Sequence, residues 1–264
     1  MRYLALILPT IITIFTFASI FLNIQEIGYP LHSTSTQSEP FAVVELFTSE
    51  GCSSCPPADK LLRQIIDNAE ENQQNIYGLG FHVSYWNQLG WRDKFSDEAF
   101  TERQKKYAKI LPNTQVYTPQ MIVNGVSVFI GSNQKEAEKA ILSALSQKAI
   151  ASIRLYGDLE TASDLVQLKY DIQGADAGQI LNVALVEQNL ANYISSGENK
   201  GYILRHDNVV RSFKSITLSG NGFGEIDLSL PENIHLDNVA VIAYLQDAET
   251  MRVLGATSLK MHDV

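Results

Sequence analysis

Two cysteines three positions apart are the feature that most constrains how this chain can fold. Cys52 and Cys55 are the only cysteines in the 264 residues, and they separate an apolar run, residues 42–47, from a segment of helical periodicity, residues 57–70. A thiol at a helix N-terminus faces unpaired backbone N–H groups and the positive end of the helix dipole, which favour the thiolate. The pattern predicts a redox-active pair, with Cys52 as the exposed attacking sulfur and Cys55 as the resolving one.

Two structural interpretations of the cysteine pair stay open beside the redox one. A bridge that only staples the loop closes a very short ring, which stabilises a fold by about 2 kcal/mol. A structural zinc site needs four ligands, and a lone pair of cysteines supplies half of them.

The first 22 residues have the pattern of an export signal. Arg2 precedes an apolar run from Leu4 to Leu22, and Thr16-Phe17-Ala18 offers a small-x-small cleavage site. The run is nearly long enough to span a bilayer, so a cleaved signal and a retained N-terminal membrane anchor both remain open. Either one predicts a periplasmic or secreted chain, in the second case tethered to the membrane by residues 4–22. Disulfides persist in such compartments.

Composition excludes some classes of function. Hydrophobic residues make up 45% of the chain and charged residues 19%, as in an ordinary globular protein. The formal net charge of -9 argues against nucleic acid as a partner, because phosphate binding needs clustered Lys and Arg.

The first half predicts an α/β unit. After a polar linker, residues 23–39, the expected elements of residues 40–150 are a strand, a helix, a second strand, a second helix, a hairpin and a last helix. Asn124-Gly125 gives the hairpin signal between residues 121–123 and 127–130. This order is that of the thioredoxin fold, a mixed sheet flanked by helices.

The second half has a different pattern. Residues 151–264 contain short runs of alternating apolar and polar residues, among them 166–172 and 181–185, and no segment of helical period. We expect six or seven strands and an all-β, sandwich-like C-terminal domain.

Three further residues are candidates for the site beside the cysteines. Thr118 and Pro119 precede the hairpin, where the thioredoxin fold has a cis-proline against the disulfide, so the Thr118 backbone is expected to pair with a substrate chain. An ordinary trans-proline at a strand start is the alternative. Glu45, in the apolar strand before the cysteines, is a candidate proton acceptor for Cys55 or else a solvated carboxylate on an edge strand.

Aromatic and polar residues elsewhere give weaker signals. His82 is either a structural residue or a third ligand, and Trp86 is either a packing residue or part of a peptide-binding lip. Gly197-Glu198-Asn199 and Arg205-His206-Asp207 form polar clusters that are expected to be loops with local hydrogen bonds.

Long runs of the sequence resemble an uncharacterised family of secreted thioredoxin-like proteins, a domain of unknown function. The resemblance covers about residues 41–256. It implies a thioredoxin-like first half and no established activity. The runs that carry it are FTSEGCSSCPPADKLL, FHVSYWNQLGWRDKFSDEAFTERQKKYA, VYTPQMIVNG, GENKGYILRHDNVVR and VIAYLQDAETMRVLGA.

Comparison with thioredoxin itself shows several departures. The strand of residues 43–47 resembles the thioredoxin strand with a buried Asp, which implies that Glu45 takes the proton-acceptor position. Gly51 stands where an aromatic residue is usual, and Ser53-Ser54 replaces Gly-Pro. Members of the secreted family often carry acids where this chain has Ser84 and Asn87.

The sequence therefore predicts an extracytoplasmic thiol–disulfide oxidoreductase without a cofactor. Its partners would be protein thiols or disulfides and an unidentified redox partner. One alternative is a copper(I) chaperone that binds the ion through Cys52, Cys55 and His82, since soft thiolates suit that ion. The other is a non-catalytic binding module in which the cysteine pair only stabilises the fold.

Overall fold

The computed structural model describes residues 39–112, 114–158 and 164–260. The expected export segment, residues 1–22, and all but the last residue of the expected linker lie outside the described residues. Within the described part, no helix is long and apolar enough to cross a membrane.

The first half contains the expected elements in the expected order. Local sequence explains their ends: the Asp97 side chain caps the second helix by accepting from the Ala99 amide, and Asn124 and Gly125 take positive φ angles in the hairpin turn. The elements are β1 (Ala42–Thr48), α1 (Pro56–Glu71), β2 (Ile76–His82), α2 (Glu98–Ile110), β3 (Gln120–Val123), β4 (Ser127–Ile130) and α3 (Gln134–Leu145).

The described part of the second half is built from strands and one short 3₁₀ turn, Leu236–Asn238. It has nine strands rather than the expected six or seven, because two of them are short and others lack strict alternation. They are β5 (Ser152–Asp158), β6 (Leu165–Gln173), β7 (Ile180–Glu187), β8 (Leu190–Tyr193), β9 (Ile203–His206), β10 (Val209–Thr217), β11 (Gly222–Ser229), β12 (Val239–Gln246) and β13 (Val253–Lys260).

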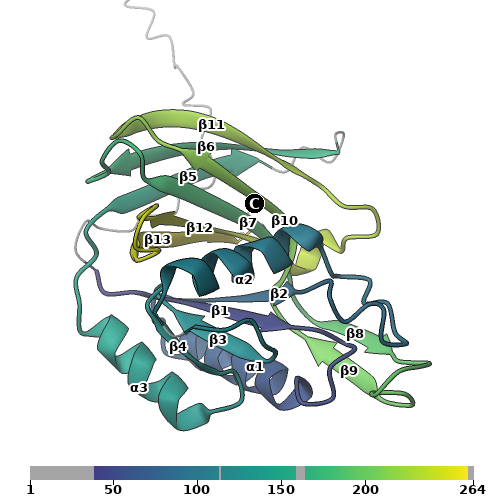
Figure 1. Cartoon of the computed structure of the whole chain (residues 1–264). Coiled ribbons are helices and arrows are strands. Elements are labelled where there is room, and N and C mark those ends of the chain that lie inside the picture. Colours follow the sequence, from purple (N-terminus) through teal and green to yellow (C-terminus); the bar gives the residue numbers. More distant parts are fainter. Residues whose placement is uncertain (1–38, 113, 159–163, 261–264) are drawn as a thin grey trace, which may run out of the picture.

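One eight-stranded mixed sheet joins the two halves. Its strand order is β13-β12-β7-β10-β2-β1-β3-β4, so four strands from each half form a single layer (Figure 1). The expectation of a separate C-terminal sandwich is not met, since the boundary at residue 151 does not separate two sheets. The halves meet where Val209 of β10 pairs with Gly80 of β2, and the Gly80 amide donates to the Asn208 carbonyl at 2.8 Å.

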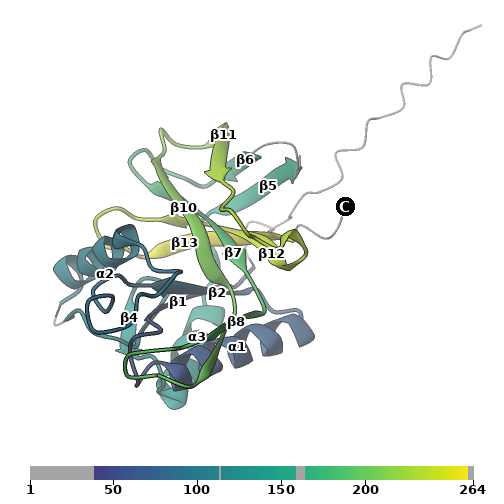
Figure 2. The same cartoon turned by 90° about the vertical axis from the view of Figure 1, so that its right-hand side faces the viewer.

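A second layer resembles the expected sandwich in part. The three-stranded sheet β11-β6-β5 lies over β7, β12 and β13, and Figure 2 shows it at the opposite end of the molecule from α1 and α3. The core between the layers is made of alternating inward residues such as Leu155, Leu168, Val183 and Val241. The second-half strands of the shared sheet are therefore covered on one face by strands rather than helices.

The first half of the sheet is covered by helices on both faces. Val44 and Leu46 of β1 point toward α1 and α3, whereas Val43 and Phe47 point toward α2, as the alternation of a strand requires. This arrangement places the loop after β1 at the carboxyl end of that strand, directly before α1 (Figure 1).

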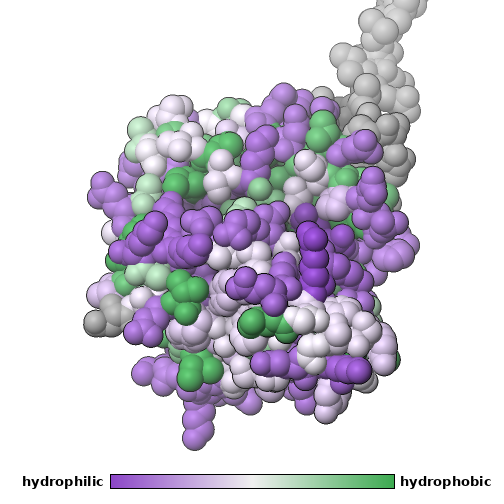
Figure 3. Space-filling view, turned by 45° about the vertical axis from the view of Figure 1, so that its right-hand side comes forward, coloured by the Kyte–Doolittle hydropathy of each residue, from purple (hydrophilic) through white to green (hydrophobic). Residues whose placement is uncertain are grey.

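The surface is mixed in polarity. On the face drawn in Figure 3, hydrophobic residues are scattered among hydrophilic ones. Such a surface is usual for a globular protein and marks no docking site by itself.

Candidate functional site

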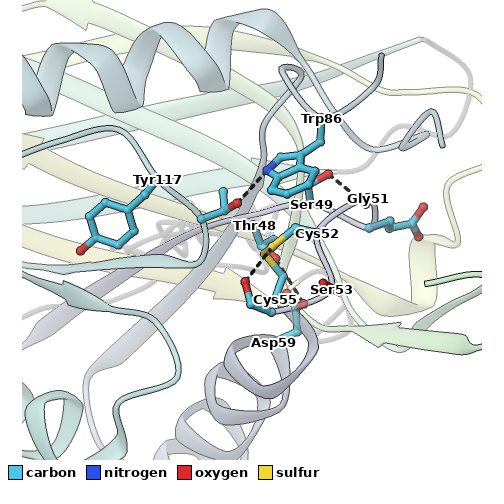
Figure 4. The surroundings of a disulfide bond; sticks show 12 residues. Thr48, Ser49, Gly51, Cys52, Ser53, Cys55, Asp59, Trp86 and Tyr117 are labelled. Carbon is cyan, nitrogen blue, oxygen red and sulfur yellow. Dashed lines mark hydrogen bonds between the residues drawn. A yellow bond between two sulfur atoms is a disulfide. The ribbon is translucent and has the colours of Figure 1, made fainter. Parts of the chain in front are cut away.

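Cys52 and Cys55 form a disulfide in the loop between β1 and α1 (Figure 4). Cys55 is the N-cap of α1 and has helical backbone angles, and Pro56 and Pro57 occupy the first helical positions, where a missing N–H group costs little. The Cys55 amide donates to the Cys52 carbonyl at 3.2 Å, which closes the loop. The pair is thus at the helix N-terminus, as the sequence predicts.

Both sulfurs are buried, which contradicts the prediction of an exposed Cys52. Cys52 and Cys55 are each 0% exposed, although Ser53 and Ser54 between them are exposed. Within the loop of residues 49–55, only these two serines are exposed to solvent. A reagent cannot contact the Cys52 sulfur in this conformation.

One cover over the disulfide comes from Trp86 in the loop after β2. A Cβ on Gly51 would lie 3.2 Å from the Trp86 Cβ, so Trp86 packs directly against the residue before Cys52. The Trp86 indole N–H donates to the Thr118 hydroxyl at 2.7 Å. The Thr118–Pro119 bond is cis, as expected, and the fold brings Trp86 and Thr118 together.

The other cover is a segment of the β8–β9 hairpin, residues 196–201, which we call the strap. Its Glu198 carboxylate accepts from the Ser53 amide at 3.0 Å, and its Asn199 amide donates to the carbonyls of Glu50 and Cys52 at 2.8 and 3.0 Å. The Gly197-Glu198-Asn199 cluster therefore makes long-range bonds to the cysteine loop. The expected local hydrogen bonds are also present, from the Lys200 amide to the Gly197 carbonyl at 3.3 Å and from the Tyr202 amide to the Asn199 carbonyl at 3.2 Å.

Next to the disulfide lies a buried group of acids and histidines, which we call the acid–histidine cluster. It contains Glu50, Asp59, His82, Asp93 and His206. Asp59 lies one helical turn after Cys55, and its carboxylate accepts from the Thr48 hydroxyl at 3.2 Å. In Figure 4, Asp59 lies on α1, below the disulfide.

His206 comes from β9 and brings the second half into this cluster. Its ring nitrogens lie 3.4 Å from Glu50 Oε1 and 3.7 Å from Asp59 Oδ1, and neither nitrogen has a hydrogen-bond partner in the described residues. Burial alone lowers the pKa of His206, but Asp59 and Glu50 outweigh it and raise that pKa to about 10. His206 is therefore an imidazolium between two carboxylates at neutral pH.

His82 pairs with Asp93, whereas the copper alternative requires it to bind an ion together with Cys52 and Cys55. Its Nδ1 is 2.6 Å from Asp93 Oδ2, and its ring meets the His206 ring edge to face at 4.8 Å. Burial alone raises the pKa of Asp93, but His82 and two backbone amides outweigh it and lower that pKa. No three His, Cys, Asp or Glu side chains within residues 39–112, 114–158 and 164–260 are arranged to hold a metal ion.

Glu45 is not placed as the expected proton acceptor. Its carboxylate receives two hydrogen bonds from the Arg103 guanidinium, at 2.7 and 2.8 Å, and one from the Tyr107 hydroxyl at 2.8 Å. These partners lie on α2, on the face of the sheet opposite α1. Asp59, which the sequence analysis did not select, is the carboxylate on the helix of the cysteine pair.

Ser84 and Asn87 hold the loop that carries Trp86. The Ser84 amide donates to the Thr101 hydroxyl at 2.9 Å, and the Asn87 amide group donates to the Ser96 hydroxyl at 2.9 Å. The Asn87 carbonyl accepts from the Asp93 amide at 3.0 Å. Both residues stabilise the loop around the acid–histidine cluster.

Sequence reasoning missed Glu50 and Asp59 and gave Asn199 and His206 no role. Only Asp59 could have been found from the sequence, because a residue four positions after Cys55 lies on the same face of the helix. Asn199 and His206 lie about 150 residues further along the chain, and only the tertiary fold brings them to the cysteines.

Comparison with known proteins places the chain in a family. A family model described as "Protein of unknown function (DUF1223)" matches residues 43–246. The chain belongs to this family. The DUF1223 match confirms the predicted membership of an uncharacterised family and spans both halves of the sheet and the strap.

One solved structure similar to this DUF1223 member is the X-ray crystal structure of a protein from Agrobacterium tumefaciens, a structural genomics target. It is 26% identical in sequence, with a TM-score of 0.61, and the match covers 87% of this chain and 98% of that chain. A search of the curated proteins found no match.

Proposed function

We propose that this DUF1223 protein is a thiol–disulfide oxidoreductase that acts through Cys52 and Cys55. The observation that carries the proposal is a disulfide closed at the first turn of α1, with a buried carboxylate one turn further on. The strand–CxxC–helix arrangement is one that tunes thiols for exchange. We further propose that β1 to α3 form a thioredoxin-like unit, on the basis of their order and of the strand order β2-β1-β3-β4.

The reaction transfers two electrons from the reduced pair to a protein disulfide. The Cys52 thiolate attacks one sulfur of the substrate, the substrate S–S bond breaks, and a mixed disulfide forms. Cys55 then loses its proton and attacks Cys52, so that the Cys52–Cys55 bond forms and the substrate leaves as a dithiol. A dithiol partner returns the electrons. The reverse sequence oxidises a substrate dithiol.

Exchange requires the covers over Cys52 to move, because its sulfur is 0% exposed. Few hydrogen bonds hold the strap, and each contributes about 1 kcal/mol to stability. Three of its side chains provide them, namely Ser196 to the Gly90 carbonyl, Glu198 to Ser53, and Asn199 to Glu50 and Cys52. A minor open state of the strap therefore gives access to the sulfur.

The proposed setting is outside the cytosol. The support for it is the basic and apolar pattern of residues 1–22, which resembles an export signal, and an oxidised cysteine pair suits that setting.

A non-catalytic binding module is the competing function, and one observation favours it. Complete burial of both sulfurs is what a structural disulfide would show. The reactivity of the pair separates the two functions, because a structural bridge resists reduction and turns over no substrate.

The test is reduction of insulin disulfides by dithiothreitol with and without the protein. We expect the wild-type protein to accelerate reduction and Cys52→Ser to remove the acceleration. Ser143→Ala is the control, since that side chain is exposed on α3, away from the cysteine loop, and should leave the rate unchanged. No acceleration by the wild-type protein, or an acceleration that survives in Cys52→Ser, would contradict the proposal.

A further inference from the structure

We propose that Asp59, paired with His206 from the other half of the chain, takes the proton of Cys55 when Cys55 resolves the mixed disulfide. This inference rests on the proposed exchange reaction. It assigns a proton acceptor to α1 and a positioning residue to β9.

The position of Asp59 suits this role. Residues four apart on a helix lie on the same face with about 5–6 Å between their Cβ atoms, and the Asp59 amide donates to the Cys55 carbonyl at 3.1 Å. Asp59 is 7% exposed and Cys55 0% exposed, so bulk water does not compete for the proton. The Thr48 hydroxyl fixes one carboxylate oxygen, Oδ2, and the other, Oδ1, faces His206.

His206 is the positive group nearest to that carboxylate. A buried carboxylate without a positive partner is strongly disfavoured as an anion. The His206 imidazolium, 3.7 Å from Asp59 Oδ1, supplies the compensating charge. Its ring nitrogens have no hydrogen-bond partner in the described residues, so the ring interacts with Asp59 and Glu50 through charge.

The titratable groups around His206 come from the first half of the chain, since β8, which pairs with β9, carries no charged residue. The loop after β1 contributes Glu50, α1 contributes Asp59, β2 contributes His82, and the loop after β2 contributes Asp93, which pairs with His82. Phe95 closes the remaining side at 6.0 Å, and Arg211 and Lys94 lie over that ring rather than over His206.

Three carboxylates thus face two imidazoles, and the carboxylates exceed the positive charges even when both rings are protonated. One proton arriving on Asp59 reduces this excess. Transfer of the Cys55 proton to Asp59 therefore lowers the excess of negative charge in the cluster.

The step balances without a further reagent. Cys55 gives its proton to the Asp59 carboxylate, and its sulfur bonds to Cys52 as the Cys52–substrate bond breaks. The substrate thiolate takes a proton from solvent, and Asp59 returns its own to solvent while the strap is open. His206 keeps its proton throughout and only holds the carboxylate in place.

The first test measures proximity through the thiolate titration of Cys55 in a Cys52→Ser background. Removing the Asp59 charge in Asp59→Asn should move the midpoint of the thiolate ultraviolet absorbance to lower pH by about one unit, because a neighbouring anion opposes a thiolate. Asp171→Asn is the matched control: Asp171 is also 7% exposed and lies in the three-stranded sheet. An unshifted midpoint in Asp59→Asn, or an equal shift in Asp171→Asn, overturns the inference.

The second test measures the proton transfer itself. The reduced protein is mixed with a chromogenic aryl disulfide, and the release of the second aryl thiolate reports resolution by Cys55. Asp59→Asn should slow this release about 100-fold near neutral pH, and the defect should shrink as rising pH ionises Cys55 directly. A defect that is the same at every pH, or no defect, contradicts the role.

His206→Gln keeps a polar side chain in place and removes the charge. We expect it to slow the second release near neutral pH by about tenfold, less than Asp59→Asn, because it acts through that carboxylate. A second release as fast as in the wild-type protein contradicts the positioning role. The titration and the aryl disulfide assay use no protein substrate. A protein that fails to reduce insulin but shows the Asp59-dependent titration would therefore refute the proposed function and leave this inference standing.

Discussion

The Glu45 carboxylate is enclosed in the first half and is bound by three donors from α2. Arg103 donates to both of its oxygens and also reaches the Gln246 side-chain oxygen of β12 at 3.3 Å, while the Gln246 amide donates to the Tyr107 hydroxyl at 2.9 Å. This network joins the two halves. At the residue scale, Glu45 is a structural charge.

Glu45→Gln is expected to lower the free energy of unfolding by about 3–5 kcal/mol, because it leaves the Arg103 charge buried without its partner. Urea unfolding measures the change. Glu138→Gln, an exposed substitution, is the control and should leave stability unchanged. If Glu45→Gln is as stable as the wild-type protein and instead slows resolution by Cys55, the assignment of the proton acceptor to Asp59 is wrong.

The strap and the loop after β2 are the elements that decide whether the cysteine pair can react. Ser196 donates to the Gly90 carbonyl at 2.6 Å, and a Cβ on Gly197 would lie 3.0 Å from the Trp91 Cβ, so the two segments pack closely. The Trp91 indole donates to Glu50 at 2.9 Å beneath them. The covers are therefore one connected unit, and movement of the strap would also loosen the loop that holds Trp86.

Asn199→Ala is expected to speed reduction of the Cys52–Cys55 bond by dithiothreitol about tenfold, since it removes two of the three side-chain hydrogen bonds from the strap to the cysteine loop. Alkylation of the freed thiols at timed intervals measures the rate. Asn221→Ala is the control, because its side chain accepts from the Ala175 amide far from the site. An unchanged rate in Asn199→Ala would show that the strap does not limit access.

The whole molecule is held together by one shared sheet and by polar contacts between its halves. Besides the β10–β2 junction, the hairpin turn of the first half meets the loop before β13, where a Cβ on Gly125 would lie 1.8 Å from the Met251 carbonyl oxygen. His206 adds a buried positive charge from the second half to acids of the first. Unfolding therefore separates these charges and also exposes apolar surface. Because the charge of His206 depends on pH, the free energy of unfolding depends on pH as well.

The pH dependence has a definite sign. The pKa of His206 is raised from 6.5 to about 10 in the folded protein, so its contribution to stability is fully present below pH 6.5 and is lost as pH rises toward about 10. We expect His206→Gln to be destabilised by a few kcal/mol at the acidic end of that window, with the difference shrinking toward the alkaline end. Unfolding across the window measures this, with the exposed His235→Gln as control. A difference that does not change with pH contradicts the ion pairing.

The sequence by itself determined the local structure of the first half and the place of the disulfide. Apolar periodicity, the Asp97 cap, the two prolines after Cys55 and the Asn124-Gly125 turn are all local signals, and each produced the expected element. The cis bond at Pro119 followed from the order of elements.

Only the tertiary structure decided how the halves combine and what surrounds the sulfurs. Strand pairing joins residues that are far apart in the chain. The local sequence of β10 or β12 therefore does not show that these strands extend the sheet of β1 and β2. The same holds for Asn199, His206 and Arg103, whose partners Glu50 and Glu45 lie 58 to 156 residues away. Burial, and with it the charge of a histidine or the reactivity of a thiol, depends on such distant contacts, so periodicity and spacing alone do not reveal it.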